Sequence, residues 1–259
     1  TMQPLGNPPG CNKNNIIPCI VDFFLREDKD LQRFYREYRY NPLVLISSKE
    51  AYDFLCETEC PLNIAHLALS LPDNYAIKPE TVFEKKYDVV MLGRQNAVLL
   101  EYLERYKMNH ADLTYVYGEK RGMNFEYFDQ SGNSLGSLSS REEYFSMLRM
   151  SRIGLYATPG MDNSRGNTNG FNQVTPRMLE YIACGCHVIS RYIKNPDTDY
   201  YEMDKMTMQV DSYDEFEFAM YRAKNAAVDM QMYSDYLAKH YTSIRVEELK
   251  KLLESLSLL

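Results

Sequence analysis

The segment from Asn172 to Ser190 reads NQVTPRMLEYIACGCHVIS and holds two charged residues in an unusual place. Thr175 and Pro176 are typical of the first residues of a helix. Arg177 then lies in the first turn, where the helix dipole disfavours a cation unless an anion binds at the same point. Glu180, one turn further on, could accept hydrogen bonds from ribose hydroxyls, as acidic residues do in dinucleotide-binding folds. The two residues together predict a nucleoside diphosphate lying across the start of the helix.

A surface ion pair is the alternative explanation of the same two residues. Arg177 and Glu180 are three positions apart in the sequence. Opposite charges at this spacing stabilise a helix by roughly a few tenths of a kcal/mol without any ligand. Spacing alone favours neither explanation over the other.

The sequence around this segment alternates predicted strands and helices. Two of the predicted strands end in glycine, and the predicted helix at Thr175 ends at Gly185, which suits a helix C-terminus. Repeated units of this kind predict a doubly wound α/β domain, in which ligands bind at the carboxyl ends of strands. The predicted elements are, in chain order, 87–93, 97–108, 112–118, 139–151, 153–159, 175–184 and 186–190.

The first part of the chain also alternates, in the order β-α-β-α-β, which predicts a small parallel sheet. A polar connector near residues 74–86 separates it from the second part, so we expect two α/β units. The tail at 234–256 contains few helix breakers and is predicted to be helical. The predicted elements of the first unit are 16–24, 28–40, 42–48, 48–58 and 63–72.

Composition excludes several classes of protein. The formal net charge of −7 leaves no excess basic charge to replace the counterions of a nucleic acid. No apolar run reaches the roughly 18 residues that a membrane helix needs, and the N-terminus lacks a signal-peptide pattern. The cysteines include no CxxC pair and the histidines none at ligand spacing, so no metal site is predicted. The sequence therefore predicts a soluble, cytoplasmic protein.

The segment that contains Arg177 and Glu180 resembles the donor-binding signature of GT-B glycosyltransferases. The likeness is to the "glycosyl transferases group 1" superfamily, especially its bacterial branch with a CgeB-like C-terminal domain. Two further stretches, YDVVMLGRQN and VYGEKRG, are similar to the family's first C-domain strand with its G-R loop and to the end of its second strand. The signature looks like T-x-R-x-x-E-x-x-A-x-G-x-x-x-I and is filled here by Thr175, Arg177, Glu180, Ala183, Gly185 and Ile189.

The resemblance implies roles for individual residues. Glu180 would bind the donor ribose, Arg94 would meet the diphosphate, and Thr175 with the following amides would bind phosphate at the helix start. The stretch from Gly136 to Leu138 would border the base. Arg94 could instead be a solvated loop arginine. The donor-binding residues predicted in this way are Gly93, Arg94, Tyr117, Gly118, Leu138, Asn172, Thr175, Arg177 and Glu180.

The chain departs from the family pattern at two points. Retaining members of the wider superfamily carry a second glutamate eight positions before the ribose acid, and Asn172 stands there in this chain. The change leaves the stereochemical outcome open. The lysine that follows the family's G-R loop is not evident, and Lys120 or Arg121 could replace its charge.

A glycosyltransferase that inverts configuration needs a base for the acceptor hydroxyl, and in GT-B enzymes this group usually comes from the first domain. Asp22 and His66 are the candidates, although Asp22 could instead cap a turn and His66 could be a core residue. The D-x-D at Asp197 and Asp199 matches the metal signature of the GT-A fold. Its place after Asn195 and Pro196 favours a turn or helix cap instead.

The resemblance implies two Rossmann-like units facing a cleft, as in GT-B enzymes. Residues 1–84 would be a short or truncated acceptor-side unit, 85–225 the nucleotide-sugar-binding domain, and 226–259 a helix packing back toward the first unit. The predicted reaction moves a sugar from a UDP- or GDP-linked donor to a glycan or glycolipid acceptor, as in polysaccharide biosynthesis. It needs no metal or other cofactor, and peripheral membrane contact stays open. A nucleotide-sugar epimerase and a non-catalytic donor-binding module are the alternatives.

Overall fold

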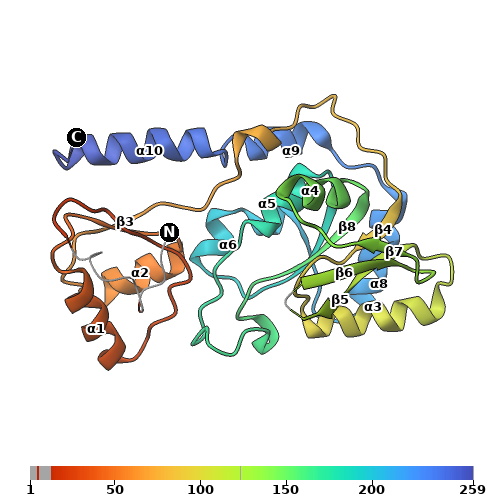
Figure 1. The fold of residues 1–259 in the computed structure, drawn as a ribbon, viewed down its shortest axis with the longest axis horizontal. Coiled ribbons are helices and arrows are strands. Elements are labelled where there is room, and N and C mark those ends of the chain that lie inside the picture. Colours follow the sequence, from red (N-terminus) through yellow and green to blue (C-terminus); the bar gives the residue numbers. More distant parts are fainter. Residues whose placement is uncertain (1–4, 6–12, 123, 259) are drawn as a thin grey trace.

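The computed structural model describes residue 5, residues 13–122 and residues 124–258. The described chain forms two separate β-sheets, a three-stranded sheet near the N-terminus and a seven-stranded sheet after it (Figure 1). Helices alternate with the strands in both parts. The predicted fold class, α/β with two Rossmann-like units of which the first is short, is confirmed.

The strands of the first sheet pair in the order β1-β2-β3 and are all parallel, so the predicted alternation is confirmed. Right-handed crossovers between strands added in one direction place the intervening helices on the same face of a sheet. Figure 1 shows α1 and α2 together on one side. The elements are β1 (Cys19–Ile20), α1 (Asp28–Tyr38), β2 (Val44–Ile46), α2 (Lys49–Glu57) and β3 (Ile64–His66), followed by a 3₁₀ turn at Asp73–Tyr75.

The strands of the second sheet pair in the order β10-β9-β8-β4-β5-β6-β7. All of them are parallel except β6 and β7, which extend β5 as antiparallel strands. The elements are β4 (Tyr87–Val90), α3 (Ala97–Asn109), β5 (Tyr115–Arg121), β6 (Asn124–Asp129), β7 (Ser134–Gly136), α4 (Arg141–Arg149), β8 (Ser151–Ala157), a 3₁₀ turn (Met161–Asn163), α5 (Arg177–Ala183), β9 (His187–Arg191), α6 (Pro196–Tyr200), α7 (Met203–Met206), β10 (Met208–Gln209), α8 (Tyr213–Asn225), α9 (Met230–Leu237) and α10 (Thr242–Ser255).

Strand order reverses between β4 and β8. The chain passes from β4 to β5 on one side, and later returns to β8 on the other side of β4 before continuing outward to β9 and β10. In open α/β sheets the loops at the carboxyl ends of two such strands diverge, which leaves a crevice between them. The sheet order alone therefore locates the expected ligand site at the ends of β4 and β8.

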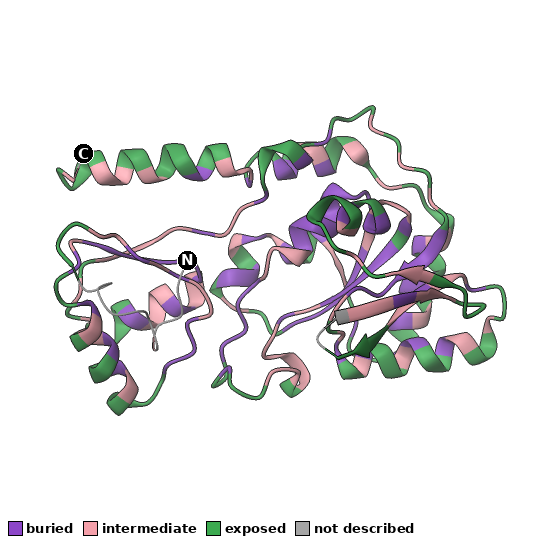
Figure 2. Cartoon of the chain, in the orientation of Figure 1, coloured by how far each residue is buried: buried purple, intermediate pink, exposed green. Residues whose placement is uncertain are grey.

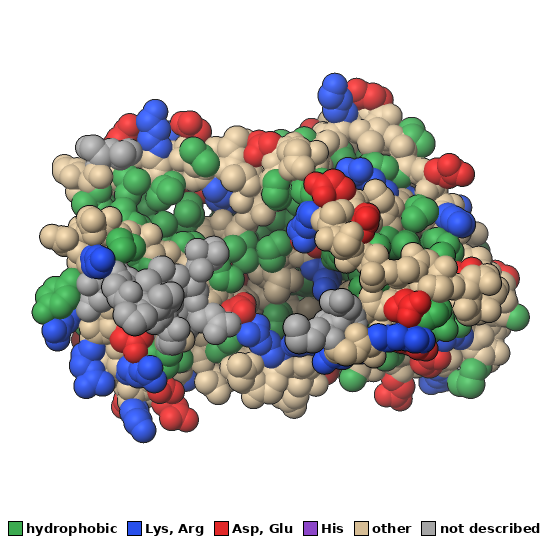
Figure 3. All heavy atoms as spheres, viewed as in Figure 1, with side chains coloured by type: hydrophobic (Ala, Val, Ile, Leu, Met, Phe, Trp, Pro, Cys, Tyr) green, Lys and Arg blue, Asp and Glu red, His purple; other side chains and the backbone are tan. Residues whose placement is uncertain are grey.

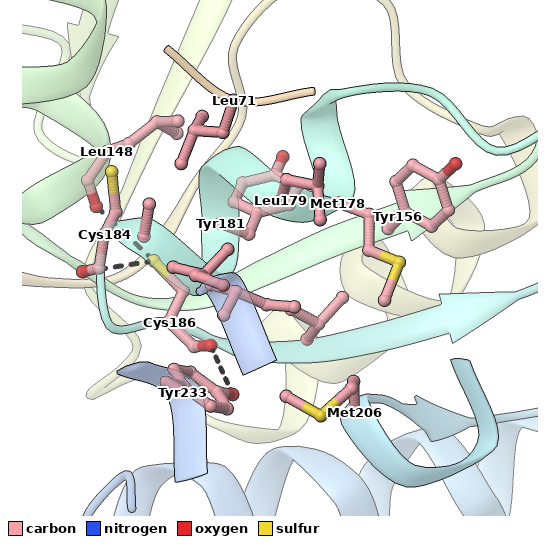
Figure 4. Close-up of a cluster of buried hydrophobic side chains, with 14 of the residues drawn as sticks. Leu71, Leu148, Tyr156, Met178, Leu179, Tyr181, Cys184, Cys186, Met206 and Tyr233 are labelled. Carbon is pink, nitrogen blue, oxygen red and sulfur yellow. Dashed lines mark hydrogen bonds between the residues drawn. The ribbon is translucent and has the colours of Figure 1, made fainter. Parts of the chain in front are cut away.

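Helix α5 is fixed against the second sheet by its apolar side chains. Every residue of α5 after Arg177 is buried (Figure 2). Tyr181 lies so close to Gly154 of β8 that a Cβ at Gly154 would come within 2.4 Å of the ring. Figure 4 shows Met178 and Leu179 in the same buried cluster as Tyr156 of β8. Close packing on this scale leaves α5 little freedom to shift, so its polar residues are held in place.

The helix also ends as predicted at Gly185, whose φ of 61° is the left-handed conformation common after a helix C-terminus. Its start differs from the prediction. Pro176 is the N-cap residue, and its side chain accepts no hydrogen bond from the first turn. The Thr175 backbone N–H and hydroxyl instead lie 2.9 and 3.4 Å from the phenol oxygen of Tyr156. The predicted threonine cap was wrong because this buried phenol engages Thr175.

The predicted helical tail at 234–256 is interrupted. Helix α9 ends at Leu237 and α10 begins at Thr242. The His240 carbonyl accepts a hydrogen bond of 2.9 Å from the backbone N–H of Leu71, and Thr242 donates one of 2.9 Å to the Leu71 carbonyl. Pairing with a strand-like segment therefore replaces one turn of helix. Beyond this break, Figure 1 shows α10 running toward the end of the molecule that carries the first sheet.

The hairpin of β6 and β7 was not predicted. It pairs Gly118 of β5 with Tyr127 of β6, and a Cβ at Gly118 would lie 2.8 Å from the Tyr127 ring. Glycine at this position is therefore explained by a close approach between strands.

The strand predicted at residues 63–72 of the first unit is shorter than expected, because pairing in the first sheet stops at His66.

The predicted domain boundaries at residues 84 and 225 stay predictions. The first lies in the segment between β3 and β4, and the second coincides with the end of α8. Residues 1–4 and 6–12 of the first predicted unit lie outside the described residues. Within the described part of the chain, no helix combines the length and the apolar character that a membrane crossing requires.

Candidate active site

A cavity of about 590 Å³ opens at the carboxyl ends of β4 and β8, where strand order reverses. Its walls come from the loop after β4, the start of α4, the end of β8 and the start of α5. Figure 3 shows a recess near the middle of the molecule, bordered by Lys and Arg side chains. The lining residues that carry charge or a reactive hydroxyl are Arg94, Arg141, Tyr144, Tyr156, Thr158, Ser164, Arg165, Thr175, Arg177 and Glu180.

Glu180 is 4% exposed and has hydrogen-bond partners on both carboxylate oxygens. Arg141 of α4 forms an ion pair with Oε1, and the Tyr144 hydroxyl donates to Oε2 at 2.9 Å. Burial and the charge of Glu180 raise the pKa of Tyr144, so its phenol keeps its proton and acts as a donor. A carboxylate has about four acceptor positions. Two are used here, which leaves capacity for two hydroxyls of a ligand.

Arg177 does not pair with Glu180, so the surface ion-pair explanation was wrong. Its guanidinium donates instead to the backbone carbonyl of Arg94, at 2.7 Å. Gly93 makes room for this contact: its φ is 64°, and a Cβ there would lie 3.1 Å from Nη2 of Arg177. The first-turn arginine therefore joins α5 to the loop after β4, with its charge at the wall of the cavity.

A buried polar network supports the floor of the cavity. The Asn96 side chain accepts from two amides at the start of α3 and donates to Ser164 at 2.7 Å and to Asp162 at 3.0 Å. Arg191, at the end of β9, holds Asp162 through two hydrogen bonds of 2.7 and 2.8 Å. These bonds lower the pKa of Asp162 and keep it ionised. The network ties the loops after β4 and β8 to each other and to the end of β9.

The predicted donor-binding residues divide between two cavities. Arg94, Thr175, Arg177 and Glu180 line the first one. Gly93, Tyr117 and Gly118 line a second cavity of about 410 Å³ on the other side of the loop after β4, and Gln95 lines both.

Two predicted donor-binding residues lie in neither cavity. Leu138 is half-buried against the core. Asn172 is buried: its side-chain oxygen accepts from Thr158 at 3.0 Å, and its backbone N–H donates to Glu50 of α2 at 2.7 Å. Of the two basic residues considered as substitutes for a lysine, Arg121 pairs with Glu126 of the hairpin at 3.1 Å, and Lys120 is exposed.

Asp22 follows β1 and faces the second unit. Arg165 donates to its Oδ2 at 3.0 Å, and Gln173 donates to its Oδ1 at 2.7 Å. Its φ of 60° is a left-handed conformation that aspartate and asparagine adopt more readily than most residues. Asp22 also lines a small cavity of about 180 Å³ formed by both units, which shares Arg165 with the first cavity.

His66 lies elsewhere. His66 is not among the described residues that line the three cavities above. Its ring packs edge-on against Tyr200 of α6 at 5.1 Å. Burial and the charge of Lys49 lower the pKa of His66 to about 4, so the ring is neutral near pH 7.

The D-x-D residues do not form a metal site in the described structure. Asn195 and Thr198 form a capping box at the start of α6, as the turn-and-cap interpretation predicts. Asp197 is 1% exposed and accepts hydrogen bonds from the Ser48 hydroxyl and the Lys49 amide at the start of α2. Asp197 thus links the second unit to the first. Among the residues described, no group of three or more His, Cys, Asp or Glu is arranged to hold a metal ion.

Arg141, Tyr144 and Arg165 line the first cavity but were not predicted. Arg141 had a recognisable signal, because it follows the Ser140 cap and so stands in a first helical turn, as Arg177 does. The same argument about the helix dipole applies to it. Arg165 sits in an irregular loop, and only its contact with the first unit distinguishes it from a solvated arginine.

No protein-family model and no curated protein sequence matches the chain. Solved structures do match it. A sucrose-phosphate synthase from Thermosynechococcus elongatus has a TM-score of 0.52 and 9% identity, covering 90% of this chain and 62% of that one. A UDP-forming α,α-trehalose-phosphate synthase from Burkholderia xenovorans has a TM-score of 0.56 and 10% identity, covering 93% of this chain and 68% of that one.

A third match is the E. coli trehalose-6-phosphate structure bound with UDP-2-fluoro glucose, with a TM-score of 0.51 and 12% identity. It covers 90% of this chain and 63% of that one, so this chain spans less than two thirds of several of its matches. At this level of identity the likeness concerns the fold. The chain has the GT-B glycosyltransferase fold.

Proposed function

We propose that this GT-B chain is a glycosyltransferase that uses a UDP- or GDP-linked sugar donor without a divalent metal. Its acceptor is a glycan or glycolipid, it acts in the cytoplasm, and it belongs to the CgeB-like branch. One observation carries the proposal: buried Glu180 and the arginines of its cavity lie at the strand-order reversal of a GT-B fold. In such sheets this crevice is where nucleotides bind.

The donor is held by charges of both signs. Glu180 has two acceptor positions left for the ribose hydroxyls. Arg94 and Arg177 approach from the loop after β4 and from α5, and they supply the positive charge that a metal ion supplies in other sites. One guanidinium group can donate to two phosphate oxygens at once. The same contacts stabilise the negative charge that develops as the nucleoside diphosphate leaves.

Asp22 is the group that the proposal assigns to the acceptor. It belongs to the first unit, and the small cavity beside it has apolar walls from Phe24 and Leu25 with polar walls from Asn167 and Asn169. A carboxylate placed there could accept the proton of an acceptor hydroxyl as the sugar is transferred. His66 plays no part in this proposal, because it is packed against Tyr200 away from the cavities.

A thermal-shift panel of nucleotides and nucleotide sugars tests the function. A ligand that binds only the folded protein raises its melting temperature, so UDP or GDP and their sugar conjugates should do so with EDTA present. UDP sugars come first, because one matching structure is described with such a donor analogue. Binding that appears only with manganese would refute the metal-free mode, and no shift with any nucleotide would refute the function. Transfer to a second substrate would separate this activity from epimerisation.

A further inference from the structure

Arg165 is the one residue that lines both the large cavity at Glu180 and the small cavity at Asp22 among the described residues. Its Nη1 donates to Oδ2 of Asp22 at 3.0 Å, and its Nε donates to Asn167 at 3.1 Å. The guanidinium also lies 4.8 Å from the centroid of the Phe24 ring. Both partners of the ion pair are about a quarter exposed, so the pair is accessible from the cavities.

Two other arginines of the large cavity have different partners. Arg177 donates to a backbone carbonyl, and Arg141 pairs with Glu180 within the second unit. Arg165 is paired with a carboxylate of the first unit, and that carboxylate is the one proposed to accept the proton of the acceptor. While Arg165 donates to Oδ2, that oxygen is not free to accept the proton of an acceptor hydroxyl.

We propose that the diphosphate of the donor and Asp22 compete for Arg165, so that donor binding transfers this arginine to the phosphates and unmasks Asp22. The inference rests on the proposed function. A diphosphate carries more negative charge than a carboxylate and offers more oxygens for bidentate contact, so it is the stronger partner. The acceptor then meets a competent base only after the donor is in place, which orders the two substrates.

Gln173 holds the other oxygen of the Asp22 carboxylate. It donates to Oδ1 of Asp22 at 2.7 Å, on the oxygen opposite the one that Arg165 uses. When Arg165 leaves, this bond keeps the carboxylate oriented with Oδ2 free. Release of Arg165 therefore changes the availability of Asp22 without changing its position.

A double-mutant cycle on nucleotide affinity tests the competition. Calorimetry with UDP and with GDP, each compared with its nucleoside, is run on the natural chain, Asp22→Asn, Arg165→Met and the double variant. Removing the competing charge should raise diphosphate affinity by about three- to tenfold in Asp22→Asn, which is roughly 0.7–1.4 kcal/mol at tenfold per 1.4 kcal/mol. Arg165→Met should lose about tenfold, and the double variant should match Arg165→Met. Affinity for the nucleosides should not change.

Matched controls come from Arg33 and Glu37, an exposed pair on α1 at 2.8 Å. Arg33→Met and Glu37→Gln make the same net charge changes away from the cavities and should leave affinity unchanged. Asparagine suits the φ of 60° at position 22, and Asp22→Gly, which suits it better, replaces that variant if its melting temperature falls.

The outcomes separate the two proposals. Failure of the natural chain to bind UDP or GDP refutes the proposed function and the inference with it. Normal binding with a change of less than about twofold in Asp22→Asn overturns the inference alone. So does a gain that persists in the double variant, because the gain would then not involve Arg165.

Discussion

The two sides of the proposed active site are built differently. Glu180, Arg177 and Arg94 lie on elements anchored to a seven-stranded sheet, and α5 is buried along its length. Asp22 follows a strand of two residues in a sheet whose other two strands have three each. Most of the binding chemistry therefore comes from the unit with the larger core. The smaller unit contributes a single carboxylate and needs outside support to hold it.

The support comes from the loop between β8 and α5. The loop belongs to the second unit by sequence, but Phe171 is fully buried in the core of the first. Asn169 donates to the Phe24 carbonyl at 2.7 Å, and the Asn172 amide donates to Glu50. The residues proposed to bind the nucleotide therefore differ from those that hold the two units together, although both lie in neighbouring segments. Substitutions should be able to separate them.

The largest effect is expected on the binding side, from Glu180→Ala. Loss of two charge-assisted hydrogen bonds to ribose, each worth roughly 1.5–3 kcal/mol, should weaken UDP or GDP binding by about a hundredfold or more. Stability should change little, since Arg141 is half exposed and can be hydrated when its partner is removed. Isothermal calorimetry and melting temperature measure the two quantities.

Glu180→Gln is the matched control for this substitution. It keeps the size and one acceptor oxygen, so its affinity should fall between those of the natural chain and Glu180→Ala. An affinity within about twofold of the natural value for Glu180→Ala would show that Glu180 is not the ribose ligand.

Phe171→Ala should lower the unfolding free energy and leave nucleotide affinity nearly unchanged. The ring packs against Phe54 at 5.5 Å and Phe23 at 6.1 Å, so its removal leaves a cavity in the first unit. A buried Phe→Ala change costs roughly 3–5 kcal/mol of unfolding free energy. Urea denaturation should show this loss, while nucleotide affinity per folded molecule should stay within a few fold. A hundredfold loss of affinity with normal stability would break the proposed separation.

The smallest effect concerns the contact of Asp197 with α2. Burial raises the pKa of Asp197 from 3.8 to about 6, and the bonds from Ser48 and Lys49 offset this only in part. The folded state therefore binds more protons than the unfolded chain between these pH values, and stability falls as pH rises through this window. The decline amounts to about 3 kcal/mol at 1.36 kcal/mol per unit.

Asp197→Asn keeps the shape of the contact but does not titrate. We expect its unfolding free energy to lack that decline, so the difference between variant and natural chain should grow in favour of the variant between pH 4 and pH 6. Urea denaturation at several pH values measures it. Parallel curves for the two proteins would show that Asp197 titrates normally.

The sequence was sufficient for features that depend on local signals. The alternation of strand and helix patterns, the Ser48 cap and the family-like spacing of Arg177 and Glu180 led to the right sheets and to residues that line one cavity. The predicted strand end at Gly118 was wrong, because β5 continues to Arg121 in pairing with β6. Features that depend on distant partners were missed. Thr175 does not cap α5, because its backbone N–H bonds to the buried phenol of Tyr156. The predicted tail helix is interrupted, because His240 and Thr242 form backbone hydrogen bonds with Leu71. The pairing of Arg165 with Asp22 joins residues 143 positions apart, which no local pattern can indicate.

Phe171 and Arg177 have a joint mechanical consequence. Only residues 172–176 separate the Phe171 ring, which is buried in the first unit, from the start of α5. A fully extended chain spans at most about 3.3–3.6 Å per residue, so the six steps from Phe171 to Arg177 reach at most about 20–22 Å. The reach of residues 172–176 therefore limits how far the first sheet can move away from α5. Because α5 has little freedom to shift on the second sheet, any movement between the two sheets has to be taken up within residues 172–176, directly before the helix that we propose binds the nucleotide.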